Sequence, residues 1–486
     1  MSEPKKTESF AGNVMKYSIA TYLGFGISGA ALIIKGVLPA ESYAVPASFM
    51  AYTMSLMNVG MLGLDQSLLR FYHEPPAGST GRSMFAACTR LSVLVMLLVG
   101  GIGSIFFAKP LAAFGLGANG AGLVPFLFLN AALYMLVRYL NVLLRLENNV
   151  RAYTTETLWM QACLNLIYLL PGFITQDARA FVLGAVCSFA GVAVFYWRRA
   201  SKGQTKEAPV RGLRPYAHIY RAALPYGIVL APAAILIPLY RAICLSFLGN
   251  YAPAAEQGSF DFAYTLAQLV TTIQAGFSTY WGPYVYAHYR TEQERIGRIH
   301  DLLNLLIFGF FCLLVMFEDI IFIIFPAKSA CLPYFPLMML AVVFSILCEG
   351  TVYGNTIARK PFQDTIGTAA GVAANIAVCA VLVPRFGVMG AAVGLVAANA
   401  TMFLYRTVTG QYYYRTIPSF SRTICGFLLA VGVAVIGVVF AHIFIIKFVL
   451  TAAILFIYCN IYRAQLYKLW QIFMGLVRRY LLHSQA

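Results

Sequence analysis

Residues 302–325, with the sequence LLNLLIFGFFCLLVMFEDIIFIIF, decide the fold of this chain. An α-helix rises 1.5 Å per residue, so a helix of this length is about 36 Å long. The hydrocarbon core of a bilayer is roughly 30 Å thick, and about 20 mostly apolar residues cross it. The stretch therefore predicts a transmembrane helix.

Further apolar stretches of similar length lie on both sides of it, separated by turn-forming and charged residues. In all, the sequence predicts fourteen helices, near residues 14–38, 45–64, 84–107, 123–145, 157–174, 180–197, 222–248, 258–284, 302–325, 334–355, 364–383, 389–409, 423–441 and 444–463.

The composition of the whole chain agrees with this pattern. Of the 486 residues, 60% are hydrophobic and only 11% are charged, whereas soluble domains carry about 25% charged residues. This excludes a cytosolic enzyme, a secreted disulfide scaffold and a disordered protein. The ten cysteines are scattered without a CxxC pair, so we interpret them as small apolar residues rather than metal or disulfide ligands. The expected fold is an all-α polytopic membrane protein.

Basic residues predict the orientation of the helices. With a cytoplasmic N-terminus, twenty-six lysines and arginines fall on the inner side. Six fall on the outer side, namely Lys35, Lys109, Arg179, Lys328, Arg385 and Lys447. Three lie within the spans, namely Arg90, Arg138 and Arg241. Cytoplasmic loops of membrane proteins carry such an excess. Both termini are therefore expected in the cytoplasm, and the net charge of +17 requires no nucleic-acid partner.

The basic segment 198–221 divides the chain. We expect a six-helix lobe at 14–197, a cytoplasmic linker at 198–221, a second six-helix lobe at 222–410, and a final helix pair with a basic tail at 411–486. A short internal repeat supports two related halves, since AYTM at 51–54 resembles AYTL at 263–266. Many secondary transporters consist of two such halves, with the binding site near their interface.

The sequence contains no signature of an enzyme. P-loop, HExxH and GxSxG motifs are absent, and no His or Cys pairs have metal-binding spacing. No loop is long enough to hold a catalytic domain. No cofactor is expected, and the function should lie among the helices.

Ionisable residues inside a bilayer are costly, so they are candidates for function. Arg241 lies within a stretch that contains Pro225, Pro232 and Pro238, which favour kinks in helices that line a cavity. It either faces a central cavity or extends its long side chain to the outer interface. Glu349 is expected mid-span, either as a proton or cation relay or as one member of a structural pair.

Two expected helices carry polar stripes. In the fourth, Arg138 lies at helical spacing between Tyr134 and Asn141. In the eighth, polar residues recur from Asp261 through Gln268 to Thr279, which predicts either a cavity wall or a helix-packing seam. Asp261 is also a candidate for ion coupling.

Three motifs carry a family resemblance. The sequence GLDQSLLRFYHE at 63–74 resembles the GLDxxxxRFxxE signature of Wzx-type polysaccharide flippases, a branch of the multidrug/oligosaccharidyl-lipid/polysaccharide exporter superfamily. FSTYWGPY at 277–284 and PRFGVMGAA at 384–392 are similar to segments of the eighth and twelfth helices of that family. The resemblance covers about residues 14–410.

This resemblance implies two six-helix lobes around a central cavity. It further implies that the protein moves a polyprenyl-pyrophosphate-linked oligosaccharide, a repeat unit of a lipopolysaccharide or exopolysaccharide, across the bacterial inner membrane by alternating access. Membrane lipids and the polysaccharide polymerase machinery would be its partners.

The pyrophosphate of such a substrate requires cations, and arginine binds phosphate oxygens through a forked pair of donors. The available cations are Arg70, Arg138, Arg241 and Lys35, and Trp281 can stack on a sugar ring. Arg70 is either a headgroup contact or an anchor at the inner interface.

Two other functions compete with this interpretation. A drug or cation antiporter of the same superfamily should carry buried acids in its first helix, which has none here. A membrane glycosyltransferase or ligase should have a long loop with a sugar-nucleotide or lipid-phosphate site, which is also missing.

Overall fold

A computed structural model describes residues 10–113, 116, 120–147, 149–201, 214–358, 360, 362–467, 471 and 474. Every regular element in this part of the chain is a helix, which confirms the predicted all-α class. The α-helices are α1 (Phe10–Val37), α2 (Ala44–Met61), α3 (Leu64–Phe71), α4 (Gly81–Phe106), α5 (Ala108–Ala113), α6 (Val124–Leu146), α7 (Val150–Asn165), α8 (Ala178–Ser201), α9 (Ala217–Tyr251), α10 (Ala254–His288), α11 (Gln293–Ile324), α12 (Phe335–Glu349), α13 (Tyr353–Ile357), α14 (Phe362–Tyr413), α15 (Phe420–Val439) and α16 (Phe444–Ile461). Short 3-10 helices add η1 (Ala40–Tyr43), η2 (Gly120–Leu123), η3 (Ile167–Phe173), η4 (Arg214–Tyr216) and η5 (Pro326–Cys331).

The helices have the length and composition of membrane spans. Within the described residues, nine are long and apolar enough to cross a bilayer, or ten if α2 and α3 count as one bent span. Each of the fourteen predicted stretches falls on helix, which supports a multi-pass membrane protein. Of the predicted linker 198–221, residues 202–213 lie outside the described part. Residues 198–201 form the end of α8, and residues 214–221 form η4 and the start of α9.

The GLD motif at 63–65 forms a sharp bend. Leu62 and Gly63 have φ angles of +49° and +69°, which end α2 and turn the chain by 55° into α3. Backbone with positive φ favours glycine. A Cβ atom on Gly63 would also overlap the backbone of Gly227 in α9, and Ser67 donates a hydrogen bond of 2.7 Å to the carbonyl of Ala223. The motif therefore joins α2 and α3 to α9.

The PRFGVMGAA motif also marks a break in the backbone. The predicted helices 364–383 and 389–409 are confirmed as two helices, which meet at a kink and together carry the label α14. Gly387 lies at this kink with φ +52° and ψ −127°. The carboxylate of Glu256 accepts a hydrogen bond of 3.2 Å from the backbone N–H of Val388, which is one of the donors freed by the break.

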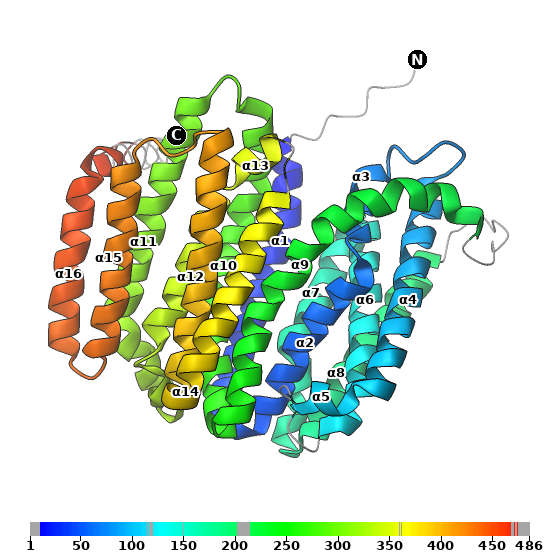
Figure 1. The fold of residues 1–486 in the computed structure, drawn as a ribbon, viewed down its shortest axis with the longest axis horizontal. Coiled ribbons are helices and arrows are strands. Elements are labelled where there is room, and N and C mark those ends of the chain that lie inside the picture. Colours follow the sequence, from blue (N-terminus) through cyan, green and yellow to red (C-terminus); the bar gives the residue numbers. More distant parts are fainter. Residues whose placement is uncertain are drawn as a thin grey trace, which may run out of the picture. The chain divides into compact units, whose positions relative to one another are not determined.

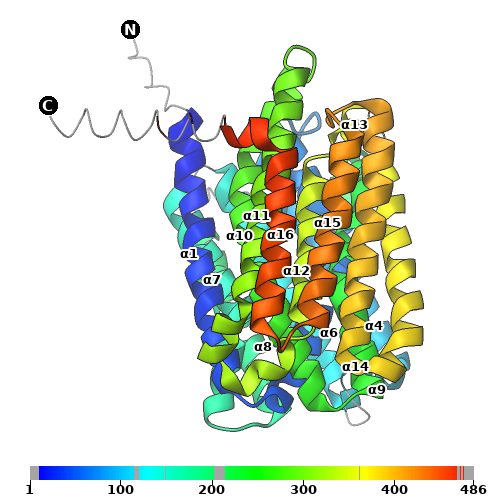
Figure 2. The ribbon, with the colours of Figure 1, turned by 90° about the vertical axis from the view of Figure 1, so that its left-hand side faces the viewer.

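The chain forms two compact units. Unit 1 comprises residues 1–281 and 361–402, and unit 2 comprises residues 282–360 and 403–486. In unit 1, α2 packs along α9 and α6, and α1 packs along α7 (Figures 1 and 2). In unit 2, α11, α15 and α16 pack against one another, and α12 packs on α15 (Figures 1 and 2). The predicted boundaries at residues 197, 221 and 410 stay predictions.

The predicted helix 222–248 is confirmed as part of α9, which continues through Pro225, Pro232 and Pro238. Lys447, predicted on the outer side, is fully buried in the first turns of α16, because acids of α11 pair with its charge. Lys328, also predicted on the outer side, is only 2% exposed. The outer side of both residues stays a prediction.

Candidate substrate-binding site

Unit 1 encloses a cavity of about 400 Å³ among α1, α2, α6, α7, η3, α9 and α10. Three of the residues predicted as substrate ligands line it: Lys35, Arg241 and Gln268. The remaining lining residues are Ser28, Met50, Ala51, Met54, Tyr134, Gln161, Leu164, Asn165, Tyr168, Ile237, Pro238, Tyr264, Thr265, Leu269 and Thr271. A cavity of this size is typical of small-molecule sites, which measure roughly 300–1,000 Å³.

Both cations of the cavity share a single carboxylate. Lys35, in the last turn of α1, places its Nζ 2.6 Å from Oδ2 of Asp261 in α10. Arg241 in α9 donates from Nη2 to the other oxygen, Oδ1. Lys35 also donates a hydrogen bond of 2.8 Å to Oγ1 of Thr265. Residues 35, 241 and 261 are far apart in the sequence, and the packing of three helices brings them together.

This ion cluster carries an excess positive charge. One carboxylate balances only one of the two cations, and the Asp261 and Lys35 side chains are 0% and 4% exposed. The Arg241 side chain is 14% exposed, and its Nε has no hydrogen-bond partner among the described residues. Burying an unbalanced charge costs several kcal/mol, on the order of 3–5 when one partner of a buried pair is removed. The cluster is therefore suited to receive an anion from the cavity.

The stripe predicted in the eighth helix explains how α10 presents these groups. Asp261, Thr265 and Gln268 follow one another at helical spacing, so they share one face. Thr265 and Gln268 line the cavity, and Asp261 lies beside them as the counter-ion. The side chains of Thr272 and Thr279, also part of the predicted stripe, lie outside the described part.

The internal repeat borders the same cavity from two helices. Ala51 and Met54 of the AYTM segment line it from α2, and Tyr264 and Thr265 of the AYTL segment line it from α10. The Arg241 guanidinium lies 5.1 Å from the centre of the Tyr264 ring, within range of a cation–π interaction.

The other part of the wall is polar without being charged. Gln161 and Asn165 of α7 contribute amides, which hydrogen-bond to each other at 3.1 Å. Tyr134 and Tyr168 add aromatic rings with hydroxyl groups. Side chains of this kind bind hydroxyl-rich ligands, because amides both donate and accept hydrogen bonds and rings pack on apolar faces.

The remaining predicted site residues lie elsewhere. Arg70 lies in the last turn of α3 with its side chain 53% exposed, 3.0 Å from Glu74. Trp281 is buried in α10 and does not line the cavity. Arg138 is half-buried on α6, one turn beyond the cavity residue Tyr134. Glu349 belongs to unit 2, where it ends α12 and accepts a hydrogen bond of 3.1 Å from Tyr353.

Two groups of buried acids were not singled out in the sequence. Glu156 in α7 is fully buried and accepts a hydrogen bond of 2.5 Å from Nδ2 of Asn141. Glu318 and Asp319 in α11 contact Lys447. Their sequence signal is an acid inside a predicted span, which is the signal that drew attention to Glu349.

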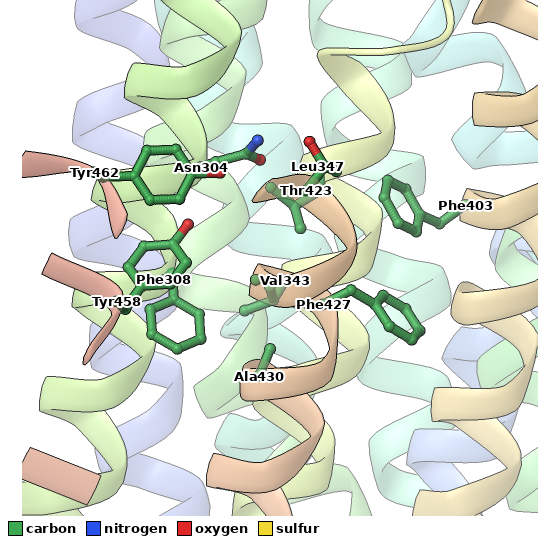
Figure 3. Close-up of a pocket in the computed structure, with 11 residues that line it drawn as sticks. Asn304, Phe308, Val343, Leu347, Phe403, Thr423, Phe427, Ala430, Tyr458 and Tyr462 are labelled. Carbon is green, nitrogen blue, oxygen red and sulfur yellow. The ribbon is translucent and has the colours of Figure 1, made fainter. Parts of the chain in front are cut away.

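Unit 2 contains a much smaller cavity between α11, α12, α14, α15 and α16. Figure 3 shows Phe308, Tyr458 and Tyr462 on one side and Phe403 and Phe427 on the other. Its volume of about 20 Å³ accommodates about one water molecule, so it is not a substrate site. Within the described residues, no group of three or more His, Cys, Asp or Glu side chains is placed to hold a metal ion.

Comparisons with known proteins identify the fold. No family model and no curated protein sequence matches the chain. Among solved structures, the lipid II flippase MurJ in an inward closed conformation matches with a TM-score of 0.65 and 12% identity, over 93% of this chain and 99% of that chain. A MATE protein in the bent conformation matches with a TM-score of 0.52 and 14% identity, over 83% of this chain and 95% of that chain. An inward-facing multidrug resistance MATE family transporter of the MOP superfamily gives a TM-score of 0.50 and 16% identity, over 81% and 94%. The chain therefore has the fold of these flippases and transporters.

Proposed function

We propose that this protein translocates a polyprenyl-pyrophosphate-linked oligosaccharide across a bacterial inner membrane by alternating access. The observation that carries the proposal is the excess positive charge on the wall of the unit 1 cavity, where Lys35 and Arg241 share the single carboxylate of Asp261. The resemblance of residues 63–74 to the Wzx-type signature points to the same substrate class.

A pyrophosphate group fits this cluster because its charge and its geometry match. The group is dianionic, and Arg241 can offer it a forked pair of donors while Lys35 contributes a point charge. In the unoccupied protein, Asp261 keeps the two cations paired and prevents their mutual repulsion. On binding, the phosphate oxygens take the place of the carboxylate, so that the cations exchange one anionic partner for another in a region of low dielectric.

The uncharged part of the wall suits the saccharide. Gln161 and Asn165 supply amides, and Tyr134 and Tyr168 supply ring faces, which together complement the hydroxyl groups and apolar faces of a sugar. The solved flippase that matches over 93% of this chain is described as acting on lipid II, and a lipid-linked substrate for this chain agrees with that match.

The charge of the cavity argues against a carrier for cationic drugs. A cationic ligand would enter a site that already holds one uncompensated positive charge. Like charges at close range in a low-dielectric site repel by several kcal/mol, about 4 at 4 Å with an effective dielectric constant of 20. The drug or cation antiporter is therefore the weaker of the two candidates.

The sidedness and the partners belong to the same proposal. The bias of twenty-six basic residues against six supports cytoplasmic termini. A flipped repeat unit must then be consumed on the outer side, so the polymerase machinery is the expected partner.

The test is a flipping assay with the purified protein in liposomes. The substrate is a fluorescent polyprenyl-pyrophosphate saccharide, and the readout is its exposure on the opposite leaflet. Arg241→Gln should slow flipping at least tenfold, and Arg241→Lys should retain part of the rate because it keeps the charge but not the fork.

The matched control is Arg90→Gln in α4. This arginine belongs to the same unit, contacts Tyr216 rather than the cavity, and does not line the wall. It should flip at the wild-type rate. Wild-type flipping by Arg241→Gln would disprove the proposed role of the cavity cluster.

A further inference from the structure

A second buried ion cluster lies in unit 2, where α11 packs on α16. Lys447 of α16 places its Nζ 2.8 Å from Oε1 of Glu318 and 2.5 Å from Oδ2 of Asp319. The side chains of Lys447 and Glu318 are 0% exposed, and that of Asp319 is 24% exposed. One cation here faces two acids, so with both acids ionised the cluster carries one excess negative charge.

An unbalanced negative charge in an apolar region has a high free-energy cost. Glu318 lies six residues before the end of α11, or about 9 Å along the helix axis, among residues that are otherwise apolar in sequence. Intramembrane acids either pair with a cation or become neutral, because an unbalanced ion in low dielectric costs several kcal/mol. Lys447 can balance only one of the two acids.

Three buried polar atoms at this cluster have no hydrogen-bond partner among the described residues: Oε2 of Glu318, Oδ2 of Asp319 and Oγ1 of Thr451. Of these, Oδ2 of Asp319 is in an ion pair with Lys447. Thr451 is fully buried and follows Lys447 by four residues, one turn along α16. Lys447, Thr451 and Tyr458 share one face of α16. Contacts at both ends of this face fix its direction: Lys447 pairs with Glu318, and Tyr458 stacks on Phe308 with ring centres 3.8 Å apart. Thr451 therefore faces α11, one turn of α16 from the lysine that pairs with the acids.

The other titratable groups around Glu318 do not balance the excess. From η5, Lys328 and Cys331 lie at the same end of α11, and Lys328 has interactions of its own. His442, in the turn before α16, is exposed. α15 and α12 carry their titratable side chains at the opposite end, where Arg422 pairs with Asp301 and Glu349 contacts Tyr353.

We propose that Glu318, Asp319, Lys447 and Thr451 form a proton-binding site. Glu318 takes up one proton on Oε2, and the neutral carboxyl group then donates a hydrogen bond to Oγ1 of Thr451. Lys447 remains paired with Asp319, so the cluster becomes electrically neutral. Asp319 is the member that reaches the surface, and it passes the proton between water and Glu318. This site does not depend on the proposed substrate and would stand if that proposal failed.

The test is infrared difference spectroscopy on the full-length protein in lipid, with the pH lowered stepwise. Protonated carboxyl groups absorb at a different infrared frequency from ionised carboxylates, so the protonation of a buried acid can be followed as the pH falls. The wild type should show a titrating buried carboxyl group that is missing in Glu318→Gln. Glu349→Gln is the matched control, since it removes an acid of the same unit outside the cluster, and it should retain the signal.

A second variant makes the result independent of the stability of Glu318→Gln. Thr451→Val leaves every charge in place and removes only the acceptor, so the carboxyl signal should persist with a shifted frequency. An unchanged titration in Glu318→Gln, or an unshifted frequency in Thr451→Val, would overturn the proposal. Loss of the signal on addition of Na⁺ at constant pH would also overturn it, because the site would then bind a metal cation instead of a proton.

Discussion

The two buried ion clusters of this protein contain the same kinds of side chain in opposite proportions. In unit 1, Lys35 and Arg241 share Asp261. In unit 2, Glu318 and Asp319 share Lys447. Each cluster is thus left with one unbalanced charge, positive in unit 1 and negative in unit 2. Under both proposals, the sign of the excess charge, and not the mere presence of buried ions, sets which ligand each cluster receives.

The two clusters also differ in how a ligand can reach them. The unit 1 cluster opens on a cavity of about 400 Å³, which has room for a phosphate group and part of a saccharide. Asp319, with its side chain 24% exposed, is the exposed member of the unit 2 cluster. This difference in access agrees with the two proposed ligands, a large anion in unit 1 and a proton in unit 2.

The largest expected effect is the difference between removing the two lysines. Lys447→Met leaves two buried acids without a cation and should lower the free energy of unfolding by about 3–5 kcal/mol. Lys35→Met removes a charged hydrogen bond worth about 1.5–3 kcal/mol but also relieves the excess positive charge, since Arg241 and Asp261 then balance, so its net loss should be the smaller of the two. The measurement is the thermal unfolding of both variants and the wild type in the same detergent. Equal losses of unfolding free energy in the two variants would mean that the clusters do not carry excess charges of opposite sign.

A second experiment asks whether Asp261 competes with the anion. Asp261→Asn leaves two unbalanced cations, so this variant should bind inorganic pyrophosphate at least tenfold more tightly than the wild type. A tenfold change corresponds to about 1.4 kcal/mol of binding free energy. Pyrophosphate should then stabilise this variant against heat more than it stabilises the wild type. An identical thermal shift in both proteins would show that the carboxylate and the anion do not share the cations.

An intermediate effect is expected at a partly exposed pair of unit 2. Arg422 lies 3.1 Å from Asp301, with side chains 33% and 3% exposed. Arg422→Gln should cost about 1–2 kcal/mol of unfolding free energy, less than a fully buried pair, because water reaches the arginine. A loss as large as that of Lys447→Met would contradict the link between burial and the value of these pairs.

The smallest effect should come from Arg70→Gln. The pair with Glu74 joins residues four apart on the surface, with side chains 53% and 75% exposed. Exposed pairs of this kind contribute about 0.3–0.5 kcal/mol, so the thermal unfolding curve should hardly move. A loss above 1 kcal/mol would indicate a role for Arg70 that the surface contact does not explain.

The sequence predicted the helices well because apolar stretches of about 20 residues are a strong local signal. It also singled out Lys35, Arg241 and Asp261, each for a separate reason. It could not predict that the three meet, since the contact joins helices separated by more than 200 residues in the case of Lys35 and Asp261. Spacing along one helix reports a shared face, but it does not report which other helix covers that face.

The unit 2 cluster was harder to predict for a related reason. Lys447 lies near the end of an apolar stretch, where a lysine commonly reaches the membrane interface. Only the packing of α11 on α16 reveals that it turns inward to two acids instead. The motifs at 63–74 and 384–392 likewise mark backbone breaks, at Gly63 and Gly387, whose geometry a pattern of letters does not contain.

The close approach of Gly63 and Gly227 constrains how the protein can move. A Cβ atom at either position would overlap the main chain of the other segment, so the turn at the end of α2 touches α9 backbone to backbone. Neither helix can rotate about its own axis at this point without the two segments separating. Arg241 lies 14 residues further along α9, about 21 Å away, and Met50 and Met54 of α2 line the same cavity. The proposed alternating access would therefore have to carry this wall and its arginine as one rigid piece, and the helices that move relative to it would be those on the opposite wall.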